Sequence, residues 1–202
     1  MPEMITLRPA HPTLGQGVLF ARYLDTATDG LLRFMLGAGF ERVISNAYVE
    51  PAHDLSYEHV TFAVRGDAVV GMVSAYSSEQ HSRSSNLPLI RGAGWRIVRA
   101  GAAAVLTGRL LRFLDDIPEG DFYLQAVAVA PDSRVGGVGT VLFEHAQGLA
   151  MAAAEDRLTL HVAVENTAAC RLYERLGMHI DATSPKASPL PGLQVHRMVK
   201  PL

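Results

Sequence analysis

A glycine-rich segment constrains this chain more than any other feature. Residues 131–140 read PDSRVGGVGT and hold three glycines and one arginine. The preceding segment, DFYLQAVAVAP (121–131), predicts a buried strand that ends at a proline, and residues 137–155 predict a helix. Because glycine adopts positive φ and lets another molecule approach the backbone, the segment predicts a tight turn whose backbone faces a ligand.

A phosphate group suits this position. The N-terminus of a helix has unpaired N–H groups and a partial positive charge of roughly half a unit, and Arg134 adds a charged donor. A purely structural turn is the alternative. Two familiar phosphate loops are excluded, because Gly139 is followed by Thr140 and Val141 instead of Lys and Ser/Thr, and Leu142 stands where a dinucleotide loop needs its last glycine.

The rest of the pattern predicts an α/β chain with a mixed sheet. Strands are expected at residues 4–10, in a hairpin over 58–76 that turns at RGDA, at 157–165 and at 193–200. Helices are expected at 12–23, at 29–36 with Asp29 as N-cap, at 41–50 and at 166–177. The segment TSPKASPLPG (183–192), with three prolines, predicts a loop.

Residues 77–121 form a longer connection than a minimal domain needs. The first part, SSEQHSRSSN, is polar and is expected to be mobile. The second carries apolar residues from Trp95 to Phe113 at helical spacing. We interpret it as a helix whose apolar stripe covers the sheet; an insertion that shapes a substrate entrance or a dimer contact is the other interpretation. Residues 1–202 are expected to form a single domain.

The composition narrows the class of protein. Hydrophobic residues make up 49% and the formal net charge is -2, so neither nucleic acid nor an acidic surface is an expected partner. We expect no signal peptide, and the sequence has no apolar run long enough to span a membrane. A lone cysteine, Cys170, excludes an internal disulfide and fits a reducing compartment, so we expect a cytoplasmic protein.

Two motifs resemble those of the GNAT acetyltransferase superfamily. VAVAPDSRVGGVGTVLFEHA is similar to its pyrophosphate motif, Q/R-x-x-G-x-G/A after a strand, with Arg134, Gly137 and Gly139 at the fixed positions. VENTAACRLYERLGM resembles its second motif, N-x-x-A-x-x-L/F-Y-x-x-x-G-F/M. The matching residues are Asn166, Ala169, Leu172, Tyr173, Gly177 and Met178, although Phe is commoner than Met at the last position. The chain thus resembles a bacterial member with an insertion before the central strand.

This resemblance implies a mixed sheet that splays around acetyl-CoA, with helices on both faces. It also implies direct acetyl transfer to a primary amine of a small molecule or peptide, with no metal. Pantetheine would bond the backbone at Val127 and Val129, an N–H near Val129 would stabilise the oxyanion, and Tyr173 would protonate the departing thiolate. The expected cofactor-binding residues are Val127, Ala128, Val129, Arg134, Val135, Gly136, Gly137, Val138, Gly139, Thr140, Asn166 and Tyr173.

Several alternatives stay open. Tyr173 would otherwise be a core residue, and Asn166 also suits a helix N-cap. The group that takes the amine's proton is undecided between a water relay and five side chains: Glu50, His53, Glu58, His59 and His161. Gln125 is excluded, because an amide is no useful base. A catalytically weak acyl-CoA sensor or assembly subunit, an unrelated nucleotide-binding module and a homodimer also remain.

Overall fold

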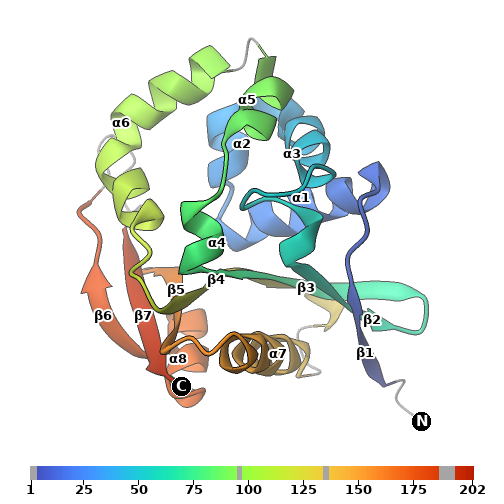
Figure 1. Cartoon of the computed structure of the whole chain (residues 1–202), viewed down its shortest axis with the longest axis vertical. Helices are drawn as coiled ribbons and strands as arrows, with labels where there is room; N and C mark the ends of the chain where they lie inside the picture. The colour runs from blue at the N-terminus through green and yellow to red at the C-terminus, as the bar shows by residue number, and fades with distance from the viewer. Residues whose placement is uncertain (1–3, 95–96, 134–136, 187–193) are drawn as a thin grey trace.

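The structure of the protein is a computed structural model that describes residues 4–94, 97–133, 137–186 and 194–202 (Figure 1). Seven strands form one sheet in the order β1-β2-β3-β4-β5-β7-β6. The strands are β1 (Ile5–Pro9), β2 (Val60–Arg65), β3 (Ala68–Ser77), β4 (Asp121–Val129), β5 (Arg157–Ala163), β6 (His179–Thr183) and β7 (Val195–Pro201). The helices are α1 (Leu14–Ala27), α2 (Leu31–Leu36), α3 (Phe40–Tyr48), α4 (Ser78–Ser82), α5 (Leu87–Ala93), α6 (Ile97–Asp115), α7 (Val138–Ala152) and α8 (Thr167–Arg175).

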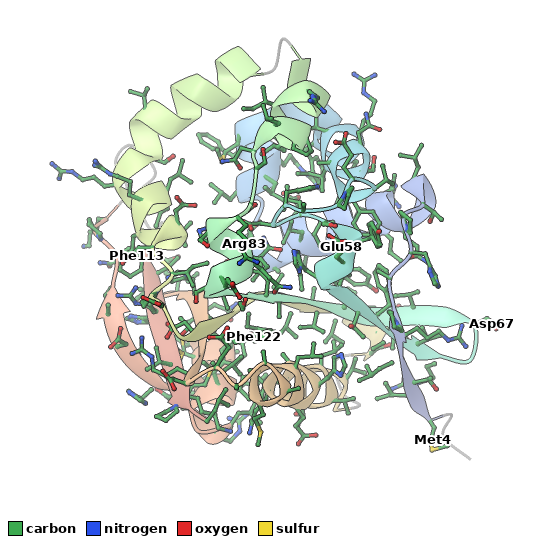
Figure 2. The ribbon with its side chains drawn as sticks, viewed as in Figure 1. Met4, Glu58, Asp67, Arg83, Phe113 and Phe122 are labelled. Carbon is green, nitrogen blue, oxygen red and sulfur yellow. The ribbon has the colours of Figure 1, made fainter. Side chains whose placement is uncertain are left out.

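Helices cover both faces of the sheet, as the sequence predicts. Helices α1 to α6 lie on one face and α7 and α8 on the other (Figure 1). The apolar core is accordingly divided: Phe20, Ile44 and Tyr48 are buried on the first face, whereas Phe122 points from β4 toward α7 on the second (Figure 2). Strands buried on both faces need near-continuous apolar runs, which explains the composition of β3 and β4.

The sheet splays between β4 and β5, its only parallel pair among the described strands. The two strands pair from Asp121 to Leu124 on β4, against Arg157 to Leu160 on β5. Beyond that point β4 continues on β3 and β5 continues on β7, so the strands diverge. The β3–β4 register also skips Gln125, which is a bulge that bends β4 further. The predicted splayed sheet is confirmed.

A buried carboxylate fastens the closed end of the splay. Asp121 is 0% exposed and accepts hydrogen bonds from Arg157 Nε and from Thr159 Oγ1, each at 2.7 Å. Both partners lie on β5. The ion pair therefore joins the two strands at the start of their paired segment, at the end away from the point where they part.

The start of α2 differs from the prediction. Asp29 is not its N-cap: the helix begins after Gly30, which has φ +80°, and Asp29 itself has φ +50°. The carboxylate of Asp25 does the capping instead, since it accepts from the backbone N–H of Arg33 at 3.0 Å and pairs with the Arg33 guanidinium at 3.1 Å. Positive φ is uncommon for a residue with a Cβ, so the sequence pattern did not predict a turn in which both Asp29 and Gly30 have positive φ.

The long connection is more ordered than its composition suggested. Part of the polar segment is helical, because Ser77 and Gln80 form a reciprocal capping box that starts α4. The predicted helix after it is confirmed as α6, although Trp95 lies outside the described residues. The C-terminal part of α6 packs through Leu110 against Val195 of β7.

Strand β6 was not predicted. It is an edge strand of which only Ala182 is partly buried, so it has no apolar alternation to reveal it. Part of the loop predicted after it, 187–193, lies outside the described residues. No described helix combines the length and the apolar character that crossing a membrane requires.

Candidate active site

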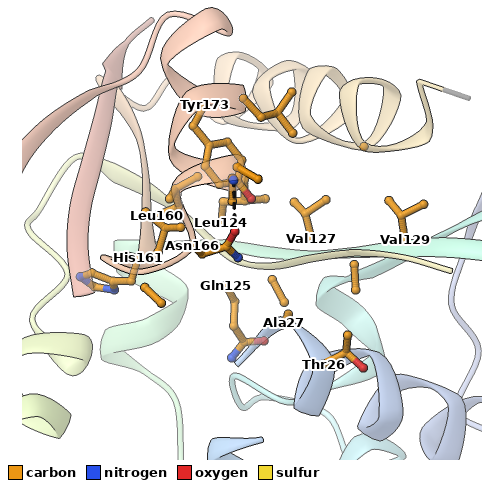
Figure 3. Close-up of a pocket in the computed structure, with 18 of the residues that line it drawn as sticks. Thr26, Ala27, Leu124, Gln125, Val127, Val129, Leu160, His161, Asn166 and Tyr173 are labelled. Carbon is orange, nitrogen blue, oxygen red and sulfur yellow. Dashed lines mark hydrogen bonds between the residues drawn. The ribbon is translucent and has the colours of Figure 1, made fainter. Parts of the chain in front are cut away.

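A cleft of about 420 Å³ opens where β4 and β5 diverge (Figure 3). Its walls come from both strands, from α8, from the start of α7 and from the end of α1. The residues that line it are Thr26, Ala27, Asp29, Leu124, Gln125, Ala126, Val127, Ala128, Val129, Gly137, Gly139, Thr140, Leu160, His161, Val162, Ala163, Asn166, Ala168, Ala169, Leu172 and Tyr173. Sequence segments 127–129, 137–140 and 166–173 therefore meet at one place.

The open edge of β4 forms the floor of the cleft. Val127, Ala128 and Val129 all line it, and β4 has no strand beside it there on the β5 side within the described ranges. The side chains of Val127 and Val129 point toward α7, whereas Ala128 packs in the core on the opposite face (Figure 3). Backbone N–H and C=O groups on this edge can bond an extended ligand as a further strand would.

The glycine turn closes one end of the cleft. Gly137 is the N-cap of α7 with φ +71°, and a Cβ built on it would meet no atom within 4 Å. Among the described residues no side chain caps this helix, so its first N–H groups are available to an anion. Val138 is 1% exposed and anchors the helix in the core, while Gly139 and Thr140 line the cleft. The other predicted residues of the turn, Arg134, Val135 and Gly136, lie outside the described residues.

Helix α8 contributes the two remaining predicted residues. Asn166 is its N-cap, because Oδ1 accepts from the backbone N–H of Ala169 at 3.1 Å, and the side chain has no other hydrogen bond among the described residues. Its Nδ2 therefore retains both protons for a ligand. Asn166 thus has the capping role that the sequence allowed.

Tyr173 reaches from α8 toward the point where the strands part (Figure 3). Its ring packs against Phe143, with centroids 6.0 Å apart. Burial, with a smaller contribution from Cys170, raises the pKa of Tyr173 to about 12. The phenol is therefore protonated at neutral pH and able to donate a hydrogen bond.

A polar and aromatic cluster on the opposite face of the sheet was not predicted. Ser74 Oγ donates to Gln125 Oε1 at 2.8 Å, and Gln125 Nε2 donates to the hydroxyl of Tyr76 at 3.4 Å. Tyr123 Oη lies 2.9 Å from Nδ1 of His161. These residues come from three strands, so only the register, with its bulge, brings them together.

Three of the candidate proton acceptors lie away from the cleft and hold the segment before β2. His53 is buried and its Nε2 bonds the carbonyl of Ala47 at 2.8 Å. Glu58 accepts a hydrogen bond from the backbone N–H of Ala52 at 2.9 Å. Glu50 forms an exposed salt bridge with Arg91 at 3.8 Å. None of the three lines the cleft.

The two remaining histidines are disfavoured as bases for a different reason. Burial lowers the pKa of His59, which packs edge-on to Tyr76 and does not line the cleft. His161 does line the cleft, but burial, together with the charge of Arg197, lowers its pKa to about 4. An imidazole with that pKa takes up few protons at neutral pH. Within the described ranges, no group of three His, Cys, Asp or Glu side chains is placed to hold a metal ion.

Known proteins resemble this chain in sequence motif and in fold over most of its length. Residues 34–178 match the model of the acetyltransferase (GNAT) family. A solved acetyltransferase is 20% identical with a TM-score of 0.67, covering 97% of this chain and 98% of its own. An N-acetyltransferase from Staphylococcus aureus Mu50 is 16% identical with a TM-score of 0.66, covering 96% and 99%. The NatC complex bound to Gag peptide and CoA is 15% identical with a TM-score of 0.56, covering 98% of each chain. No significant match was found among curated proteins.

Proposed function

Because this chain belongs to the GNAT family of acetyltransferases, we propose that it transfers the acetyl group of acetyl-CoA directly to a primary amine of a small molecule or peptide. One observation carries the proposal. A single cleft joins an open strand edge, a helix N-terminus that no described side chain caps, and a protonated tyrosine. These are the three features that an elongated thioester with a diphosphate requires.

Acetyl-CoA would lie along this cleft. The N–H groups at the start of α7, around Gly137 to Thr140, bind the pyrophosphate, and the space beside Gly137 leaves room for it. The pantetheine arm pairs with the edge of β4 at Val127 and Val129, and Asn166 Nδ2 donates to one of its amide carbonyls. This orientation places the thioester near Tyr173, where β4 and β5 part.

The transfer needs one bond made and one broken at the thioester carbon. The amine nitrogen attacks the carbonyl carbon, and a backbone N–H of β4 stabilises the oxygen as it becomes negative; because the thioester lies where the strands part, this N–H lies nearer to Gln125 than to Val129. The C–S bond then breaks, and the Tyr173 hydroxyl gives its proton to the departing sulfur. Burial makes this phenol a weaker acid, but the same burial disfavours a free thiolate, so the leaving group also gains affinity for the proton.

Water carries away the proton that the amine loses. Glu50, His53 and Glu58 pair with other groups away from the cleft, and His59 also lies outside it. His161 lines the cleft but has little affinity for a proton at neutral pH. The amine attacks in its neutral form, and its surplus proton leaves through solvent or restores Tyr173. The products are the N-acetylated acceptor and CoA thiol.

Acceptor and turnover can be tested together. Purified protein is incubated with acetyl-CoA and amino acids, polyamines, aminoglycosides or peptides with free N-termini, and thiol release is followed with a colorimetric reagent. We expect amine-dependent release with at least one class, accompanied by a mass increase of one acetyl group on the acceptor. Acetyl-CoA binding without transfer to any amine would contradict the proposal and favour a sensor.

A further inference from the structure

One buried side-chain atom lacks a hydrogen bond among the described residues. It is Nε2 of His161, which has no exposed surface and no partner within reach. Folded proteins pair nearly all such atoms, because an unpaired polar atom in the interior is destabilising. An exception beside a ligand cleft indicates a partner that is present only when the ligand is bound.

His161 lies on the face of the sheet from which the amine acceptor would approach. On β5, the neighbours Leu160 and Val162 pack in the core beneath α7, so the alternation of a strand turns His161 to the other face. Gln125 lies on that same face, whereas Tyr173 lies on the α8 side (Figure 3). An amine that attacks a thioester held by α7 and α8 would approach from the side of His161 and Gln125.

The ring of His161 is neutral and held in place. Its Nδ1 is engaged with the Tyr123 hydroxyl at 2.9 Å, and its pKa of about 4 keeps it uncharged at neutral pH. If the Tyr123 hydroxyl donates to Nδ1, Nε2 carries the ring proton and is a donor; if Nδ1 donates to the hydroxyl oxygen, Nε2 is an acceptor. It can therefore pair with a hydroxyl or an amide.

The charges nearby disfavour a second cation. The positive charge of Arg197 lowers the pKa of His161, and its guanidinium lies over the ring of Phe113 at 5.4 Å. Two carboxylates, those of Asp116 and Asp181, pair with Arg197 at 3.2 Å and 3.1 Å. An ammonium group at Nε2 would thus meet a guanidinium whose charge dominates at His161, and carboxylates that already pair with it.

Phe113 packs against the imidazole and also borders a groove. The two ring centroids are 5.2 Å apart, and Phe113 lies on the last turns of α6 beside the sheet (Figure 2). The other side of Phe113 borders a shallow groove of about 600 Å³, whose lining also includes Arg109, Arg112 and Pro185. A turn of this ring toward the groove would open access to Nε2.

We propose that Nε2 of His161 binds a neutral hydrogen-bonding group of the acceptor, a hydroxyl or an amide, and disfavours acceptors with a second ammonium group there. The inference rests on the proposed acetyl transfer to an amine. It assigns His161 to recognition of the acceptor and not to proton transfer. The acceptor class is therefore a monoamine with a neutral polar group at a fixed distance from its nitrogen.

The test uses primary amines that differ only at the far end. Each ends in a methyl, hydroxyl, carboxamide or ammonium group, on a matched series of spacer lengths. At one spacer length we expect kcat/KM for the hydroxyl or carboxamide amine to exceed that of the methyl amine about tenfold, with the diamine below both. His161→Phe keeps a ring against Phe113 and should reduce this preference to about twofold or less, leaving the affinity for acetyl-CoA unchanged.

His145→Phe is the matched control, because His145 also bonds a hydroxyl, that of Thr61 at 3.2 Å, but does not line the cleft. It should retain the preference. A preference that survives His161→Phe overturns the inference alone, and so does an equal rate with methyl and hydroxyl amines at every spacer length. No transfer to any amine overturns the proposed function and this inference with it.

A measurement on the wild-type protein covers the case in which His161→Phe does not fold. The ¹⁵N signal of His161 Nε2 is recorded with CoA bound, before and after the best hydroxyl amine is added. We expect it to shift with that amine and to stay in place with the methyl amine of equal length. Equal shifts, or none, overturn the inference.

Discussion

Gly137 offers a graded test of the anion site at the start of α7. Its φ of +71° is costly for other residues, but a Cβ there would meet no atom within 4 Å. Gly137→Ala should therefore lose about 1 kcal/mol of unfolding free energy from backbone strain alone. Gly137→Gln and Gly137→Glu add side chains of equal size, of which only the second is charged.

The ligand-induced change in Tm separates these effects. Acetyl-CoA at a hundredfold excess over its Kd adds about 2.7 kcal/mol to the stability of the wild type. For a domain of this size that corresponds to roughly 5–10 °C in Tm. The shift should persist in Gly137→Ala, shrink in Gly137→Gln and disappear in Gly137→Glu, because the carboxylate lies where the pyrophosphate binds.

Each variant serves as its own reference, since the unliganded Tm reports the strain and the shift reports binding. Thermal melts with dephospho-acetyl-CoA, which keeps the pyrophosphate, should give the same ranking. If Gly137→Glu shows the same ligand shift as the wild type, the pyrophosphate does not bind at this turn and the reasoning fails.

Two further predictions concern the strands and the tyrosine. Asp121→Asn should lower the unfolding free energy by about 2 kcal/mol in urea melts, since it weakens a fully buried acceptor of two hydrogen bonds. The control Glu119→Gln, at an exposed position, should change the unfolding free energy by less than about 0.5 kcal/mol. Similar effects of the two substitutions would contradict the role of Asp121 at the closed end of the splay. The pH profile of kcat should rise as the amine loses its proton and show no fall below about pH 10, because Tyr173, with a pKa raised to about 12, keeps its acidic proton throughout that range. A fall near pH 8 that vanishes in Tyr173→Phe would show that the phenol ionises in the working range.

The part of the site that lies close together in the sequence could be predicted, and the part assembled across strands could not. The turn at Gly137 and the start of α8 at Asn166 depend on local backbone chemistry, which a glycine or a capping side chain reveals. The bond between Tyr123 and His161 depends on the position of β5 relative to β4. The bulge at Gln125 fixes which face carries that side chain, and periodicity alone does not show a bulge.

The same distinction explains the errors in the fold. Apolar periodicity reports burial, so it revealed β4 and α7 but not β6, which is exposed along nearly its whole length. The polar composition of 77–86 concealed a helix start, because the capping box of Ser77 and Gln80 stabilises α4 through side-chain hydrogen bonds and not through burial.

The role of Tyr173 is tested most directly by kcat and the Kd for acetyl-CoA, both measured on folded Tyr173→Phe. The substitution keeps the ring against Phe143 and removes a hydroxyl that has no hydrogen bond among the described residues, so the fold and the Kd should change little. The account predicts a kcat about 10²-fold lower, the low end for loss of a positioned acid, because CoA is a good leaving group. A kcat within about threefold of the wild type, with chemistry shown to be rate-limiting, would contradict it and leave Tyr173 as a packing residue.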